Sequence, residues 1–277
     1  MTVIDIACAA EGADWVPHNA AMLHSLLAAN RDHRIRIHFL HGRDIRRGTR
    51  RKLVAMVERE GGEISFERIS DRRLRGMPTA GFIGKATWYR MFLPELRPEL
   101  DRILHLDSDL LVLDSLAPLW AVDLDGKWVG AVTNVLQDDH LDHPAELGIP
   151  STQAYFNAGV LLMNLTEMRS DQCTEALLSY SRAKGEELMW RDQDALNAVL
   201  GSRRLELHPR WNVMNSVLLF PRAVEIFGGE AVDEARAHPA IRHFEGPGVN
   251  KPWHPDCPHE SRELYFEHRR HTPWSDP

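Results

Sequence analysis

The chain has 277 residues, enough for one large domain or two small ones, and its 43% hydrophobic and 26% charged content is ordinary for a globular protein. A net charge of −7 without a long basic region argues against a nucleic-acid partner, and three distant cysteines show no disulfide or zinc spacing. Because no apolar stretch approaches the roughly 18 residues needed to cross a bilayer, we expect a cytoplasmic protein, at most peripheral to the inner membrane face.

The first part of the chain alternates predicted strands with predicted helices. Apolar and β-branched patterns predict strands at 3–9, 35–39 and 64–69, and amphipathic patterns predict helices at 17–30 and 49–60. The second helix should end at Gly61-Gly62. This order of elements is typical of a parallel sheet covered by helices.

The remainder of the chain continues the α/β pattern. We expect helices at 87–93, 171–183 and 192–200, and strands at 103–106, 110–113, 128–133, 156–164 and 240–244. No internal repeat, low-complexity tract or linker separates these segments. The simplest organisation is therefore one α/β domain with a C-terminal appendage.

Two carboxylates, Asp107 and Asp109, interrupt the apolar segment 103–113. In an extended backbone both side chains of such a triplet point to the same side, which suits a divalent cation that prefers oxygen ligands. A polar turn whose carboxylates cap local N–H groups is the alternative. Ala9-Ala10-Glu11 and His243 also follow predicted strands, and parallel sheets bind ligands beyond the carboxyl ends of their strands. This agreement favours the metal interpretation.

With these residues assembled, the chain resembles the retaining glycosyltransferases of family 8, especially bacterial lipopolysaccharide galactosyl- and glucosyltransferases. The resemblance covers residues 3–257 and rests on five blocks: HLDSDLLVLDSLAPLW (105–120), WVGA (128–131), YFNAGVLLMNL (155–165), RDQDALN (191–197) and HFEG…KPWH (243–254). It implies a GT-A type fold, with a Rossmann-like, mostly parallel sheet flanked by helices and a small antiparallel element.

The resemblance also implies an activity in lipopolysaccharide biosynthesis. The family transfers a hexose, here galactose or glucose, from a UDP-sugar to a saccharide or glycoconjugate acceptor, with Mn²⁺ and with retention at the anomeric carbon. We expect the catalytic domain to span residues 1–257 and a helical tail to span 258–277. Membrane-associated relatives carry basic, aromatic tails. Here Tyr265, Phe266, Arg269, Arg270 and Trp274 form a weak version, for which a solvated terminal helix is favoured over peripheral membrane contact.

By resemblance, Asp107, Asp109 and His243 are the metal ligands. Two carboxylates and one imidazole suit Mn²⁺, with Mg²⁺ as the alternative. Gly246 and Lys251 match the loop that closes over the diphosphate, although the segment PGVN makes this loop two residues longer than in relatives. That insertion leaves the placement of Lys251 open.

The resemblance assigns further residues to the donor. Ala9, Ala10 and Glu11 match positions that hold uracil and ribose, with Glu11 in place of the usual Asp. Trp15 aligns with a Tyr that stacks on the base, and core packing of Trp15 is the alternative. Arg90 matches an Arg near the donor sugar and phosphate, and Ser108 matches a position that touches the ribose.

For the transferred sugar, the resemblance indicates Asn157, Asp192 and Gln193. The residue matching Gln193 lies near the β-face of the anomeric carbon, and a Gln is a poor nucleophile, so attack on the same face is favoured over double displacement. Asn134 stands where relatives often have Asp, which removes one candidate carboxylate.

Two other functions are weighed against the transferase. An aspartyl-phosphate phosphatase also uses an Asp-x-Asp triplet after a strand, but its triplet normally follows the first strand, with Thr or Val rather than Leu111 two places on. A non-catalytic nucleotide-sugar binder would share the fold and the metal site. The set of Asp107, Asp109, His243, Lys251, Asp192 and Gln193 argues against such a loss of activity.

Overall fold

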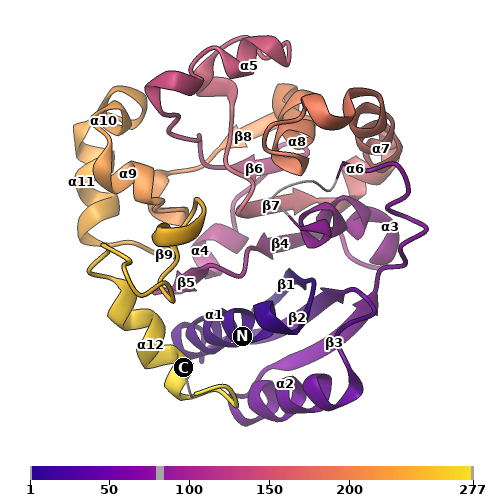
Figure 1. Cartoon of the computed structure of the whole chain (residues 1–277), viewed down its shortest axis with the longest axis vertical. Helices are drawn as coiled ribbons and strands as arrows, with labels where there is room; N and C mark the ends of the chain where they lie inside the picture. Colours follow the sequence, from indigo (N-terminus) through magenta and orange to yellow (C-terminus); the bar gives the residue numbers. More distant parts are fainter. Residues whose placement is uncertain (1, 79–83, 276–277) are drawn as a thin grey trace.

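A seven-stranded sheet forms the centre of the molecule (Figure 1). The computed structural model describes residues 2–78 and 84–275. The strand order is β3-β2-β1-β4-β7-β6-β8. The strands are β1 (Val3–Ala10), β2 (Arg34–His41), β3 (Glu63–Arg68), β4 (Arg102–Leu106), β6 (Val129–Ala131), β7 (Val160–Asn164) and β8 (Arg204–Glu206). Only β7 runs antiparallel to its neighbours, so the expected mostly parallel sheet is confirmed.

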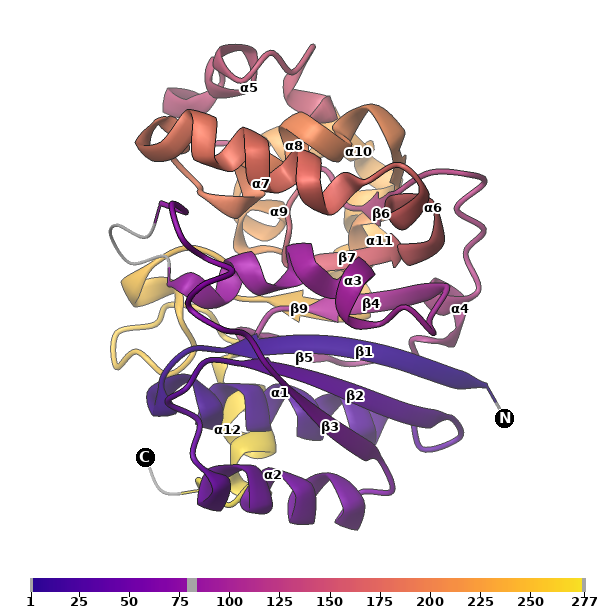
Figure 2. The same cartoon turned by 90° about the vertical axis from the view of Figure 1, so that its right-hand side faces the viewer.

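Helices cover both faces of the sheet (Figure 2). Alternate residues of β1 point to opposite faces, so Ile4 and Ile6 join one apolar core and Ala7 joins the other. The first core lies against α1 (Val16–Ala29) and α2 (Arg47–Arg59). The second lies against α6 (Leu165–Ser170), α7 (Cys173–Lys184) and α8 (Asp192–Leu200).

A second, two-stranded sheet lies beside the first. Its strands, β5 (Leu110–Val112) and β9 (Ile241–His243), pair antiparallel, with Leu110 opposite His243. This pairing is the expected small antiparallel element. It carries a histidine from late in the chain to the Asp-x-Asp turn that precedes β5.

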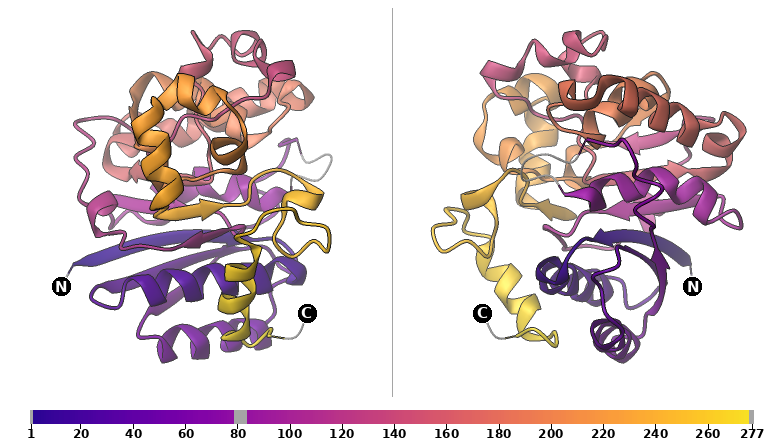
Figure 3. Two further views of the ribbon diagram at one scale, coloured as in Figure 1. Left: turned by 90° about the vertical axis from the view of Figure 1, so that its left-hand side faces the viewer. Right: turned by 45° about the vertical axis from the view of Figure 1, so that its right-hand side comes forward.

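The remaining helices are short or terminal. They are α3 (Leu93–Leu96), α4 (Ala117–Trp120), α5 (His143–Glu146), α9 (Asn215–Leu219), α10 (Arg222–Phe227), α11 (Gly229–Ala237) and α12 (Arg262–Arg270). The tail contains a helix, α12, as expected. One face packs along α1 (Figure 3), with Tyr265 only 2% exposed, while Glu263, Glu267 and Arg270 are exposed. No helix in the described ranges is long and apolar enough to span a membrane.

Some predicted elements differ from the structure. The helix expected at 87–93 is a 3₁₀ helix, Lys85–Phe92, that leads into α3. The strand expected at 156–164 begins only at Val160, because the Asn157 side chain accepts a 2.9 Å hydrogen bond from Gly159 N and turns the backbone there. That turn brings polar groups to the carboxyl edge of β4.

Candidate functional site

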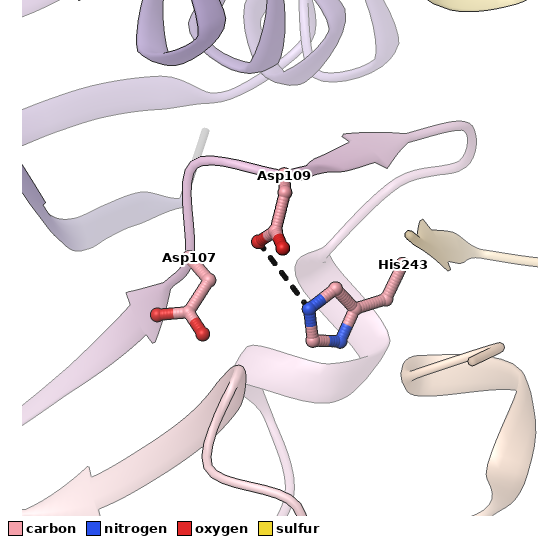
Figure 4. A group of neighbouring side chains, drawn as sticks. All are labelled: Asp107, Asp109 and His243. Atoms are coloured by element: carbon pink, nitrogen blue, oxygen red, sulfur yellow. Dashed lines mark ion pairs between the residues drawn. The ribbon is translucent and has the colours of Figure 1, made fainter. Parts of the chain in front are cut away.

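The turn between β4 and β5 carries two of the three predicted metal ligands. It is anchored on both sides, since Asp107 N donates to Gly159 O at 2.9 Å and Phe244 N donates to Asp109 O at 2.9 Å. Ligand atoms of Asp107, Asp109 and His243 all lie within 4.8 Å of one another (Figure 4). The structure therefore brings His243 to the two carboxylates, which lie more than 130 positions earlier in the sequence.

The imidazole of His243 is oriented by a relay of amides. Its Nδ1 lies 2.9 Å from Asn212 Oδ1, and Asn212 Nδ2 donates to Asn157 Oδ1 at 2.8 Å. Because an amide oxygen only accepts, Nδ1 carries the proton and Nε2 faces Asp109 Oδ1 at 3.4 Å. An imidazole nitrogen beside two carboxylates is a donor set that fits Mn²⁺ or Mg²⁺. Sequence reasoning gave no signal for Asn212.

Cations flank this cluster. Lys251 Nζ forms an ion pair with Asp109 Oδ2 and donates to Phe244 O at 3.0 Å. Burial alone would raise the pKa of Asp109, but Lys251 and His243 outweigh it and hold that pKa below its usual range. Asp109 therefore stays ionised, as a metal ligand must.

Arg90 is the second cation and is almost completely buried. Its guanidinium donates to Asp107 Oδ1 at 2.8 Å, to the carbonyl of Ala158, and through Nε to Thr87 O at 3.0 Å. Its Nε also lies 3.2 Å from Asp192 Oδ2. Burial raises the pKa of Asp192 to about 6, while Arg90 opposes that rise. Arg90 thus joins the metal cluster to the start of α8.

Gln193 lies next to this pair, and three neighbours, Ala158, Asn157 and Tyr155, orient its amide. Its Oε1 accepts from Ala158 N at 3.0 Å and lies 3.3 Å from Asn157 Nδ2. Its Nε2 donates to the Tyr155 hydroxyl at 3.3 Å, and that hydroxyl donates to Asp194 Oδ1 at 2.5 Å. The amide oxygen is therefore directed toward the Asn157 turn.

Behind Tyr155, the fully buried Asp194 is held by two further groups. Trp190 N donates to Asp194 Oδ2 at 2.9 Å, and His143 Nε2 lies 2.9 Å from Asp194 Oδ1. The hydrogen bond to Asp194 raises the pKa of His143. Sequence reasoning missed these supports. Tyr155 and Asp194 lie inside the quoted blocks YFNAG and RDQDALN, whereas His143 had no recognisable signal.

The predicted nucleotide-binding residues lie at the end of β1. Ser108 Oγ donates to Ala9 O at 3.3 Å and accepts from Asn19 Nδ2 at 3.0 Å, which fixes the Asp-x-Asp turn against β1. Ala10 ends the strand, and Glu11 follows it with a carboxylate that accepts a hydrogen bond from Lys85 N. Glu11 therefore caps the 3₁₀ helix that positions Arg90.

Trp15 lies outside the core, with 38% of its surface exposed, so the alternative of core packing is wrong. Its ring contacts His18 and Trp253 edge-on, at centroid distances of 5.8 and 5.7 Å. His18 in turn stacks on Trp253 at 3.5 Å, and its Nδ1 lies 2.6 Å from the Tyr265 hydroxyl. These rings attach the loop around Lys251 to α1.

Gly246 opens that loop in a conformation suited to glycine. Its φ is +90°, and a Cβ there would lie 2.7 Å from Asn250 Nδ2. The segment PGVN contains a short 3₁₀ turn, Gly248–Asn250, directly before Lys251. With this loop length, Lys251 contacts Asp109.

Comparison with known proteins agrees with this arrangement. The model of glycosyl transferase family 8 matches residues 7–257. General stress protein A of Bacillus subtilis is 29% identical over 98% of this chain and 94% of its own length. Lipopolysaccharide 1,2-glucosyltransferase of Escherichia coli is 26% identical over 81% of this chain and 66% of its own.

A solved structure extends the likeness to three dimensions. The crystal structure of galactosyltransferase LgtC with donor and acceptor sugar analogs superposes with a TM-score of 0.86 at 30% identity, covering 98% of this chain and 96% of that one. The sheet with its flanking helices is thus the GT-A-like fold of LgtC. The chain belongs to glycosyl transferase family 8.

Proposed function

We propose that the protein is a Mn²⁺-dependent, retaining hexosyltransferase that moves galactose or glucose from a UDP-sugar to a saccharide or glycolipid acceptor. The observation that carries this proposal is the convergence of Asp107, Asp109 and His243 between two cations, Arg90 and Lys251. A divalent cation flanked by a guanidinium and an ammonium is the arrangement that a diphosphate requires. The phosphatase alternative has no need of the second cation on a separate, late loop.

Mn²⁺ held by Asp107, Asp109 and His243 would supply Lewis-acid stabilisation of the departing diphosphate, with Mg²⁺ as the alternative ion. The chain's own residues do the remaining work. Lys251 reaches the diphosphate from the Gly246 loop, and Arg90 holds Asp107 in place while its buried charge attracts the donor phosphate. Both side chains exclude water from the side of the leaving group.

The nucleotide is proposed to lie along the end of β1. Ala9 and Ala10 offer backbone groups without side-chain bulk, and Ser108 lies within reach of the ribose. Glu11 Oε2 already accepts a hydrogen bond from Lys85 N. The other carboxylate oxygen of Glu11 is therefore the one that would accept from the uracil N–H. Trp15, exposed beside Trp253, supplies a face for the base, and base–aromatic stacking contributes about 1–3 kcal/mol.

The sugar is proposed to lie against Asn157, Asp192 and Gln193. Gln193 Oε1 accepts from Ala158 N, which withdraws electron density from an amide oxygen that is already a weak nucleophile. Asp192 pairs with Arg90 rather than standing alone behind the sugar. Both features support attack on the same face, with Gln193 stabilising positive charge at the anomeric carbon and Asp192 orienting the donor through Arg90.

The setting of the reaction is also a proposal. We place residues 1–257 in the catalytic unit and 258–277 in the tail, and we assign the enzyme to lipopolysaccharide biosynthesis at the cytoplasmic face of the membrane. The burial of Tyr265 removes it from any membrane contact of the tail. Such a contact would fall to Phe266, Arg270 and Trp274.

Calorimetric titration with UDP, GDP and ADP, with and without Mn²⁺, tests the donor site without knowledge of the acceptor. We expect UDP to bind only when Mn²⁺ is present. If GDP or ADP bound more tightly than UDP, the base recognised by Glu11 and Trp15 would be a purine rather than uracil. Absence of metal-dependent binding to any nucleotide by folded protein would refute the transferase and revive the phosphatase.

The ligand assignment is tested by substitution. Asp107→Ala and Asp109→Ala should each abolish turnover of the UDP-sugar without unfolding the protein. Asp114→Asn is the matched control, because Asp114 lies in the same segment but pairs with Arg210 at 2.8 Å. Wild-type turnover in either alanine variant with Mn²⁺ would refute the metal site. Metal-dependent UDP binding without any turnover by the wild type would identify a non-catalytic binder.

A further inference from the structure

The start of α2 carries the densest positive charge in the chain. Between residues 43 and 52 the sequence places six cations and one carboxylate, in a protein whose net charge is −7. The side chains of Arg43, Arg46, Arg47, Arg51 and Lys52 are exposed, and Arg50 is half-buried. This local positive charge is opposite in sign to the net charge of the whole protein.

Most of these cations lack a counter-ion. Arg43 lies 3.9 Å from Asp44, whereas no ion pair within residues 2–78 and 84–275 joins Arg46, Arg47, Arg50, Arg51 or Lys52 to a carboxylate. Many cations elsewhere on the surface have such partners; Arg34, for example, pairs with Glu63 at 2.5 Å. Self-repulsion among unpaired cations costs stability, and an external anion would relieve it.

A groove with an apolar floor runs beneath these cations. Val54, Ala55 and Phe66 form its apolar part, and Arg47, Arg50 and Arg51 form its rim together with Glu58. The guanidinium of Arg50 lies 5.9 Å from the centre of the Phe66 ring. Phe66, on the edge strand β3, is half-buried and lines this groove. The surface therefore combines cations with accessible apolar area.

The basic run also lies at the same edge of the sheet as the donor site. β1 and β2 are parallel, with Ala10 opposite His41, so the segment after His41 emerges beside the segment after Ala10. A second hollow lies between these two segments. Its lining residues are Ala13, Arg43, Asp44, Arg46 and Thr49. Whatever binds the basic run is held next to the opening of the active site.

We propose that the α2 surface, defined as Arg43, Arg46, Arg47, Arg50, Arg51 and Lys52 with the groove over Phe66, docks the enzyme on a bilayer rich in anionic phospholipids. Phosphate headgroups complement the guanidinium rim, and the apolar floor accepts glycerol and acyl carbons, which a nucleic acid backbone would not fill. Lys52 also lies 5.7 Å from the Trp274 ring, so the tail joins this surface at its rim. This inference does not depend on the donor or on the metal.

Co-sedimentation with vesicles of phosphatidylcholine, with or without phosphatidylglycerol, at low and high salt tests the proposal. The variant Arg47→Glu/Arg51→Glu reverses two exposed cations on the groove rim. Acidic residues are favourable near a helix start, so α2 is expected to fold. Since each basic residue near an anionic surface contributes about fivefold to binding, we expect the partition onto anionic vesicles to fall by about 25-fold.

The control variant Arg31→Glu/Arg182→Glu has the same net charge but changes exposed residues outside the α2 surface. It should partition like the wild type, and both variants should bind UDP with Mn²⁺ as the wild type does, which separates this test from that of the donor site. The proposal is overturned if the wild type does not co-sediment with anionic vesicles, or if it co-sediments equally with vesicles of phosphatidylcholine alone. It is also overturned if both variants lose vesicle binding equally. Tight salt-sensitive binding to duplex DNA without vesicle binding would assign the surface to nucleic acid instead.

Discussion

Lys251 shares Asp109 with any cation bound to Asp107 and His243, so its charge has opposite effects on two ligands. Removing the ammonium relieves repulsion of the metal but removes a donor to the diphosphate. Lys251→Met should therefore strengthen binding of Mn²⁺ alone by about three- to tenfold, and weaken UDP binding at saturating Mn²⁺ by about tenfold or more. Calorimetry measures both, with Lys127→Met as control. A fall in both affinities would show that Lys251 instead stabilises the site.

The hydroxyl of Tyr155 transmits the position of Asp194 to Gln193. Tyr155→Phe keeps the buried ring and removes the hydroxyl that accepts from Gln193 Nε2 and donates to Asp194 Oδ1. The amide then loses one of its fixed contacts next to the proposed reaction centre, so we expect kcat to fall by about tenfold, with KM for the donor nearly unchanged. Steady-state kinetics with thermal melting provide the measurement. A change confined to KM or to stability would give Tyr155 a purely structural role.

At the residue scale, the sequence predicts groups with their own chemistry and misses the groups that orient them. Asp107, Asp109 and His243 were identified because carboxylates at strand ends match a known set of blocks. Asn212 and His143 were missed because they act through distant residues: His243 is 31 positions from Asn212, and Asp194 is 51 positions from His143. A local pattern cannot show such a partner, because the contact exists only after the chain has folded.

At the scale of elements, α12 docks on α1 partly through a cluster of histidines. His24 Nδ1 lies 2.9 Å from His268 Nδ1, and the His24 ring stacks on His271 at 4.8 Å. Burial first, and then His268, lowers the pKa of His24 to about 4, and burial also lowers that of His268. Glu60 opposes the shift of His24, and Arg59 reinforces it. The docked helix therefore disfavours protonation of this cluster.

Acidification should consequently loosen α12. An undocked histidine binds a proton near pH 6.5, whereas docked His24 does so only near pH 4, so the stability of docking is present above pH 6.5 and decreases as the pH falls toward 4. Hydrogen exchange of residues 262–270 at pH 7 and pH 5, each compared with the intrinsic exchange rate at that pH, should show lower protection factors at pH 5. His24→Phe should reduce this difference. Equal protection at both pH values in the wild type would contradict the prediction.

The elements that the sequence predicted are those with strong periodicity. The strands and helices of the first 70 residues were placed within a few residues, because β1 and α1 are nearly continuous apolar segments. β8 was missed, since it has three residues and no buried position. The helices α9, α10 and α11 were also missed, because each is held mainly by packing against the rest of the chain rather than by its own pattern.

At the scale of the whole molecule, the metal cluster joins segments far apart in the chain. Asp109 precedes β5 and His243 ends β9, so a bound cation reinforces the pairing of these two strands, and a nucleotide adds the Gly246 loop with Lys251. A ligand that binds only the folded state stabilises it by about 2.7 kcal/mol at a hundredfold excess over its dissociation constant. UDP with Mn²⁺ should therefore raise Tm by about 5–10 °C in a chain of this size.

If UDP binding requires the metal ion, Tm should stay unchanged when either the ion or one of its ligands is removed. UDP with a chelator should have no effect, because without the cation the diphosphate would face the carboxylates of Asp107 and Asp109, which repel it. Asp109→Asn should lose the shift with UDP and Mn²⁺ together, while Asp114→Asn keeps it. Differential scanning calorimetry of the wild type, Asp109→Asn and Asp114→Asn measures these changes in Tm. If UDP raised Tm equally with and without a chelator, nucleotide binding would not depend on the strand pairing that carries His243, and the cation would have no part in holding the two segments together.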